Sequence, residues 1–124
     1  MPVTYSWYND NQTVLLVEFK QKWAWDDMYR VRDAVLAEYT GDNRVDVIAD
    51  FSKTRHVPPN AMTHGRKALE KMHPNQGIQI FVGVPTMLKM MFDAAKTLMP
   101  QVIVDANFAF ADTFDEALRI IETQ

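Results

Sequence analysis

The chain has 124 residues and a mass of 14.3 kDa, which suits one domain spanning 1–124 and is too little for two independent cores. It contains no cysteine, so disulfides, thiolate metal sites and iron–sulfur clusters are excluded. A net charge of -3 argues against generic binding to DNA or RNA, which requires a basic face.

The first third of the chain predicts a hairpin followed by a helix. Residues 3–8 mix β-branched and aromatic side chains, as strands do. Residues 13–19 form a second apolar strand that does not alternate, which is typical of a strand covered on both faces. The polar stretch between the two strands favours an antiparallel hairpin. A helix is expected from about Trp25, with acids in its first turn, to a stop at Gly41.

Three further strands are predicted from short apolar runs that turn signals interrupt. They cover residues 45–50, 77–84 and 108–111, and the second of these is the clearest interior strand. Residues 102–104 are also apolar, but so short a run is ambiguous between a strand stub and an apolar loop.

Three further helices alternate with these strands. The first is expected to be capped by Asn60 and to run to about Met72; the second, capped by Thr86, ends before Pro100. The last is expected to begin with a capping box at Thr113–Glu116. The resulting order is β-β-α-β-α-β-α-β-α. It predicts an α/β fold with a mixed, mostly parallel sheet of about five strands, four helices and an antiparallel edge strand.

Several segments resemble the STAS/SpoIIAA-like family of anti-sigma-factor antagonists. The strand that ends in Asp50-Phe51-Ser52 is similar to the family's strand–Asp–Leu–Ser segment, and residues 112–118 resemble the acidic start of its last helix. The helix start at 25–27 and the Pro58-Pro59 loop look closer to a STAS/SEC14-type branch of unknown function. The resemblance covers nearly the whole chain. It implies a STAS-like fold and a regulatory protein-interaction module of the bacterial cytoplasm.

One position departs from the pattern of that family. Antagonists place a phosphorylatable serine at the start of the helix after the third strand, where this chain reads Val-Pro-Pro-Asn-Ala-Met over 57–62. Ser52 and Thr54 lie earlier in the loop, and Thr63 lies a few residues into the helix. The phosphorylation switch of the family is therefore not carried over to this chain.

The segment that follows residues 45–50 is the best candidate for a binding site. It leaves the carboxyl end of an interior strand, where open α/β sheets usually place ligand sites. Its acid, hydroxyls, cations and histidine meet the free amides of a helix N-terminus, which suits a phosphate, a carboxylate or an acidic partner surface. The alternative is a solvated loop stiffened by prolines. The candidate ligand- or partner-binding residues are Asp50, Ser52, Lys53, Thr54, Arg55, His56, Asn60, Thr63 and His64.

No standard catalytic or metal-binding motif occurs in the sequence. His56 and His64 are eight residues apart, without HExxH or HxH spacing and without a carboxylate between them. No serine lies in a G-x-S-x-G motif, and the four glycines form no phosphate-binding or dinucleotide fingerprint. We therefore predict no metal, no cofactor and no catalytic residue. An enzyme that uses His56 or His64 with Asp50 as acid and base is the weakest alternative.

Methionines and tryptophans mark two further regions. Met87 and Met91 share the apolar stripe of the third helix and are most simply core, whereas Met90 falls off that stripe and is expected at the surface. The methionines could alternatively form a dimer or partner face, or the gate of an apolar-ligand pocket. Of Trp23 and Trp25, one ring is expected to staple the helix entry and the other to lie near the surface, and core or edge packing is favoured over stacking on a ligand.

These observations favour a non-enzymatic regulatory or protein-interaction module with a protein partner and a working edge at 52–64. A homodimer is a further expectation, and nucleic acid is not an expected partner. The alternative function is a SEC14-like carrier of a small apolar or anionic ligand, which would need a cavity of about 300 Å³ or more. Neither a signal peptide nor the ~20 apolar residues of a membrane span are visible, so a cytoplasmic location is expected.

Overall fold

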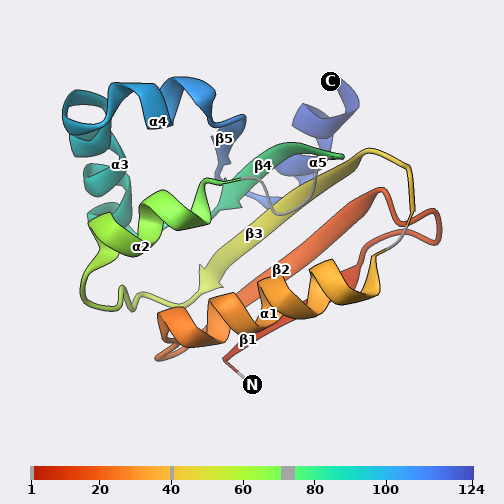
Figure 1. Cartoon of the computed structure of the whole chain (residues 1–124), viewed down its shortest axis with the longest axis horizontal. Helices are drawn as coiled ribbons and strands as arrows, with labels where there is room; N and C mark the ends of the chain where they lie inside the picture. Colours follow the sequence, from red (N-terminus) through yellow and green to blue (C-terminus); the bar gives the residue numbers. More distant parts are fainter. Residues whose placement is uncertain (1, 40, 71–74) are drawn as a thin grey trace.

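The computed structural model describes residues 2–39, 41–70 and 75–124, and this part of the chain forms five strands and five helices (Figure 1). The strands form one sheet in the order β1-β2-β3-β4-β5. β1 runs antiparallel to β2, and the other neighbouring strands are parallel. The predicted α/β fold with a mixed, mostly parallel sheet is therefore confirmed. The elements are β1 (Val3–Trp7), β2 (Val14–Lys20), α1 (Trp25–Glu38), β3 (Val45–Lys53), α2 (Ala61–Ala68), β4 (Gln76–Val82), α3 (Thr86–Leu98), α4 (Pro100–Asp105), β5 (Phe108–Ala111) and α5 (Phe114–Glu122).

The helices differ from the four that the sequence predicts. Residues 102–104, expected as a strand stub or an apolar loop, lie in the additional helix α4, which begins at Pro100. Proline suits the first helical position because its fixed φ fits the helix and its missing N–H would have no partner there. α2 ends at Ala68 with Leu69 as its C-cap, so it is shorter than the helix to about Met72 that the sequence predicts; Met72 itself lies outside the described residues.

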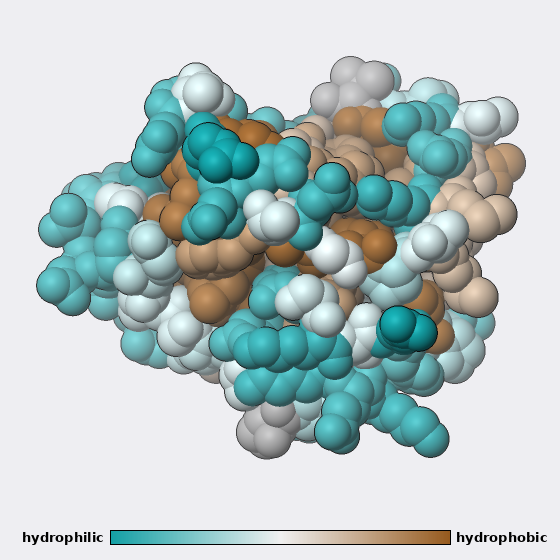
Figure 2. All heavy atoms as spheres, turned by 180° about the vertical axis from the view of Figure 1, so that it is seen from behind, coloured by the Kyte–Doolittle hydropathy of each residue, from teal (hydrophilic) through white to brown (hydrophobic). Residues whose placement is uncertain are grey.

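Three helical connections lie on the same face of the sheet. Strands β2 to β5 follow one another in sheet order, so the connections through α1, α2 and α3–α4 all advance in the same direction. Because crossovers between parallel strands are right-handed, these connections must share one side. Buried residues of α1, α2 and α3 belong to one hydrophobic core, whereas α5 packs on a second, smaller core (Figure 1). Figure 2 shows the molecule from behind, where apolar residues reach the surface between hydrophilic ones.

The inner strands contribute to both cores. In β2, Leu15 and Val17 belong to the larger core and Val14 to the smaller one, which confirms that this strand is covered on both faces. All residues from Val45 to Ala49 in β3 are buried. These strands therefore form the rigid centre from which the loops and helices extend.

Thr113 caps its helix as predicted, Thr86 does not because it is the first residue of α3, and α1 has a carboxylate cap that the sequence pattern did not predict. At the start of α1, the Asp27 carboxylate accepts a hydrogen bond from the Ala24 amide at 2.9 Å. At the start of α5, the Thr113 hydroxyl accepts a hydrogen bond from the Glu116 amide at 3.1 Å, and the Glu116 carboxylate accepts one from the Asp112 amide at 3.0 Å. The capping box at α5 is confirmed, with the acid bonding one residue before Thr113.

A buried acid fixes the start of β4 against β3. Asp46 is only 7% exposed, and its Oδ1 accepts a hydrogen bond from the Ile78 amide at 2.9 Å. The Nε of Arg44 donates to the same oxygen at 3.1 Å. The Nη2 of Arg44 lies 3.0 Å from that oxygen and completes an ion pair. At Gly77, an added Cβ would lie 2.1 Å from this Asp46 oxygen and 2.2 Å from Arg44 Nε. A residue without a side chain is therefore required beside the pair.

Replacing Asp46 by alanine should lower the free energy of unfolding by about 1–3 kcal/mol, because the buried Ile78 amide loses its acceptor. Asp42→Ala removes the same side chain at an exposed position and should change stability by less than ~0.5 kcal/mol. Urea unfolding followed by tryptophan fluorescence measures both variants. An unchanged urea midpoint for Asp46→Ala would contradict this role.

Candidate functional site

The predicted binding segment begins where β3 ends, beside the turn that follows β4. The Asp50 carboxylate accepts a hydrogen bond from the Ser52 amide at 2.9 Å. Gly83, with a φ of 62°, approaches so closely that an added Cβ would lie 3.0 Å from the Cα of Ser52. The ends of two parallel strands therefore meet here, at the edge where α/β sheets usually place their ligand sites.

Two of the candidate side chains are engaged within the fold. Lys53 donates a hydrogen bond from Nζ to the carboxylate of Glu18 on β2, and this bond raises the pKa of Lys53. Thr54 is buried; its hydroxyl donates to the Gln21 carbonyl at 2.5 Å and accepts from the His56 amide at 3.1 Å. The Thr54 side chain holds the loop to the residues after β2, and it is not available to a ligand.

Two indole groups anchor the rest of the loop. Trp23 donates from Nε1 to the His56 carbonyl at 3.0 Å, and Trp25 donates from Nε1 to the Pro59 carbonyl at 2.8 Å. The two rings meet edge to face, with centroids 4.8 Å apart. Both rings are buried, which confirms that they pack within the fold, whereas the prediction that one of them lies near the surface is wrong. Their role as anchors of the loop could not be foreseen from the sequence, because the bonded residues are 33 and 34 positions apart.

His64 packs against α1. Its ring stacks on Trp25 at a centroid distance of 5.2 Å, and its Nδ1 lies 2.6 Å from the Tyr29 hydroxyl. Burial raises the pKa of the Tyr29 phenol. Asp50 bonds to Ser52 and His64 to Tyr29, and no hydrogen bond joins Asp50 to either histidine in the described part of the chain. The contacts of His64 are therefore those of a residue that holds α2 to α1.

Asn60 does not cap α2 as predicted. Its backbone lies in the left-handed region, with φ 63° and ψ 34°, and its side chain makes no capping hydrogen bond. Only its carbonyl takes part, accepting from the His64 amide at 3.1 Å. The prediction failed because the chain turns sharply after Pro59, which carries the Asn60 side chain away from the first-turn amides. Among the remaining candidates, Arg55 and Thr63 are exposed and His56 is half-buried.

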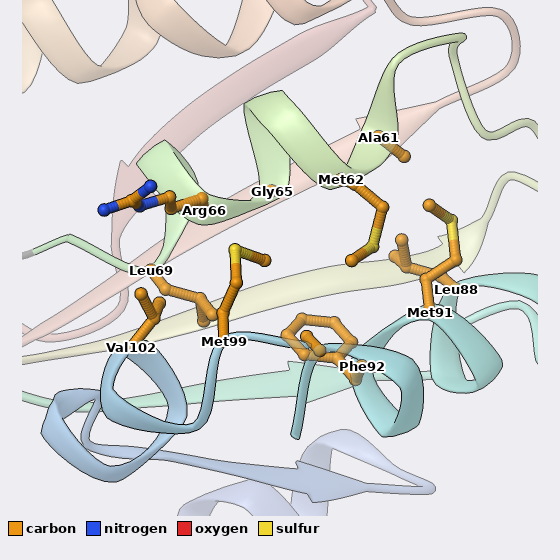
Figure 3. Close-up of a pocket in the computed structure, with 11 residues that line it drawn as sticks. Ala61, Met62, Gly65, Arg66, Leu69, Leu88, Met91, Phe92, Met99 and Val102 are labelled. Atoms are coloured by element: carbon orange, nitrogen blue, oxygen red, sulfur yellow. The ribbon is translucent and has the colours of Figure 1, made fainter. Parts of the chain in front are cut away.

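A groove that the sequence did not reveal lies between α2 and α3 (Figure 3). Met62 and Gly65 line it from α2, and Met91 and Phe92 line it from α3. Near one end it is bounded by Met99, whose side chain points into the same space in Figure 3. The space within the groove is only ≈ 30 Å³, far below the volume of about 300 Å³ that a bound small molecule needs.

Exposed apolar side chains run along α3 beside this groove. Met87 is 63% exposed, Met90 65% and Leu98 70%. Met87 and Leu98 fall on the same line of the helix as Met91, which lines the groove, because residues three, four and seven apart share one helix face. The prediction for Met90 is confirmed, whereas the prediction that Met87 is core is wrong. α3 buries Leu88 and Ala95, and this leaves the adjoining part of its apolar arc in solvent.

The charges of the chain are distributed unevenly. Residues 51–100 contain seven lysines and arginines against two acids, whereas the rest of the chain contains six against fourteen. The basic segment includes the loop after β3, α2 and α3, that is, the elements that form the groove and the exposed stripe. The net charge of -3 therefore conceals a basic segment, which contains the two helices that form the groove.

No group of three or more His, Asp or Glu side chains in the described residues is arranged to hold a metal ion. None of the helices described is long and apolar enough to cross a bilayer. No protein-family model matches the chain, and a search of curated proteins found no match.

Trp25→Phe should lower the free energy of unfolding by about 1 kcal/mol more than Trp7→Phe. Both substitutions remove similar ring volume, but only Trp25 loses a hydrogen bond, since Trp7 Nε1 is buried without a partner in the described structure. Thermal unfolding of the two variants provides the comparison. Equal losses would show that the bond to Pro59 contributes nothing.

Gly65→Ala should raise the free energy of unfolding by about 0.5–1 kcal/mol, because alanine favours the helix and its Cβ meets nothing within 4 Å. Gly83→Ala should lower it, since a side chain there would have a φ of 62° and press on Ser52. Chemical denaturation of both variants shows whether the free energy of unfolding rises or falls in each. Destabilisation by Gly65→Ala would mean that the groove floor is closed.

Proposed function

We propose that the protein is a non-enzymatic protein-interaction module whose binding surface is the α2–α3 face. This face consists of the groove between the two helices and the exposed stripe Met87 and Leu98, which shares one line of α3 with the groove residue Met91. The observation that carries the proposal is the exposure of this stripe directly beside an apolar groove. Contiguous apolar surface of this kind marks interaction sites in soluble domains, and methionines adapt to the shape of a partner.

An α-helical segment of a partner protein fits this surface best. The groove and the stripe run along α3 for up to the thirteen residues of that helix, which corresponds to a length of about 20 Å. Helix-in-groove recognition uses apolar anchors at such spacing. Gly65 leaves open space at the groove floor, where an anchoring side chain could enter.

The edge at 52–64 that the sequence predicts overlaps this face, because Ala61 and Met62 line the groove, and its loop holds α2 in place. Its backbone is held by Trp23 and Trp25, and it leads directly into α2. The exposed residues Arg55 and Thr63 remain accessible to a bound partner. The resemblance to STAS proteins favours a regulatory role in the bacterial cytoplasm, without the phosphorylation switch that their serine provides.

The two other functions have less support. A small-ligand carrier would need a cavity of about 300 Å³ lined by Met and Phe. The space within the groove that has this lining is ≈ 30 Å³. An acid–base enzyme would need Asp50 and a histidine to converge, but their described hydrogen bonds lead to different residues.

Selection of helical peptides from a displayed library tests the proposal. Peptides enriched on the wild-type protein should lose binding at least about tenfold to Gly65→Leu, which fills the open space beside α2, and to Met87→Glu, which places a charge on the stripe. Leu36→Glu is the matched control, because Leu36 is an exposed apolar residue on the outer side of α1. Binding lost only in the control, or retained by all three variants, would exclude the α2–α3 face.

A further inference from the structure

We propose that the segment bound by the α2–α3 face is an acidic amphipathic helix. This inference rests on the proposed function, because it specifies the chemistry of the partner at the same surface. It is drawn from the charges around the groove, which are independent of the apolar residues that define it.

Two exposed arginines, one on the groove and one in the loop before α2, form no ion pair among the described residues. Arg66 lines the groove and is exposed, and Arg55 is exposed in the loop that leads into α2. Neither makes an ion pair or a side-chain hydrogen bond in the described structure, in contrast to Lys53 and Lys96, which pair with acids. These two arginines are therefore available to carboxylates of a partner.

The helix ends add to this positive potential. α2 and α3 begin at the same end of the groove, as Figure 3 shows from the positions of Ala61 and Leu88. Neither helix has an acid in its first turn or a side-chain cap, whereas α1 and α5 have acids in theirs. Backbone amides at helix N-termini favour negative charge. Arg66 lies at one end of the apolar groove and the two helix N-termini lie at the other (Figure 3), which matches a helix with apolar anchors and acidic flanks.

Two other occupants fit less well. A second copy of the chain offers two helices with acidic first turns, α1 and α5, but their apolar faces are packed on their own sheet. A membrane surface is flat, whereas Met62 and Met91 line a recess between helices, which a bilayer does not fill (Figure 3). A helical side chain can enter that recess.

Two synthetic peptides of 18 residues with identical leucine spacing, one with glutamates and one with lysines on the polar face, test the inference by fluorescence anisotropy. The glutamate peptide should bind at least about tenfold more tightly at low salt, and the difference should shrink at high salt. Arg55→Glu with Arg66→Glu should reverse the preference. Arg119→Glu, an exposed arginine on α5, is the control and should leave the preference unchanged.

The outcomes separate this inference from the proposed function. If both peptides bind equally, or the lysine peptide binds better, and Gly65→Leu abolishes binding, the acidic partner is wrong and the binding face stands. If Gly65→Leu affects neither peptide, both proposals fail. Vesicles of phosphatidylglycerol form a third arm, and tighter binding to them than to the glutamate peptide would replace the acidic helix with an anionic membrane.

Discussion

All helical connections between the parallel strands lie on one face of the sheet, and the rest of the structure depends on this constraint. Because sheet order equals chain order and crossovers are right-handed, α1, α2 and α3 lie on the same side. α2 and α3 both follow the carboxyl ends of neighbouring parallel strands, so they start together. The groove between them is a consequence of the topology, and Gly65 leaves its floor unfilled.

The aromatic residues before and within α1 make this arrangement rigid. Trp23 and Trp25 hold the backbone of the loop after β3, and Tyr29 contacts His64 on α2. α2 is thereby fixed to α1 on one side, while its other side faces the groove. A surface whose backbone is held in this way loses little freedom when a partner binds, which favours affinity.

The alternation of strands and helices could be predicted because hydrophobic periodicity and capping residues are local signals. α4 could not, since the β-branched run from Val102 also suits a strand, and only the proline before it favours a helix. Met87 shows a second limit. Periodicity marks the apolar arc of α3, but it does not tell which part of that arc faces the sheet. For the site, the sequence pointed to the loop after β3 as a candidate. Which parts of that loop and of α2 are free depends on Trp23, Trp25 and Tyr29, which contact them from 33 to 35 positions earlier in the chain.

Methionine methyl NMR tests most directly whether the α2–α3 face is the binding surface. The protein would be labelled at the methionine methyl groups and titrated with a peptide selected on the wild type. We expect the resonances of Met62, Met87 and Met91 to shift, whereas that of Met28, which packs in the core from α1, should not. Saturable shifts at Met28 with none in α2 or α3 would contradict the proposal.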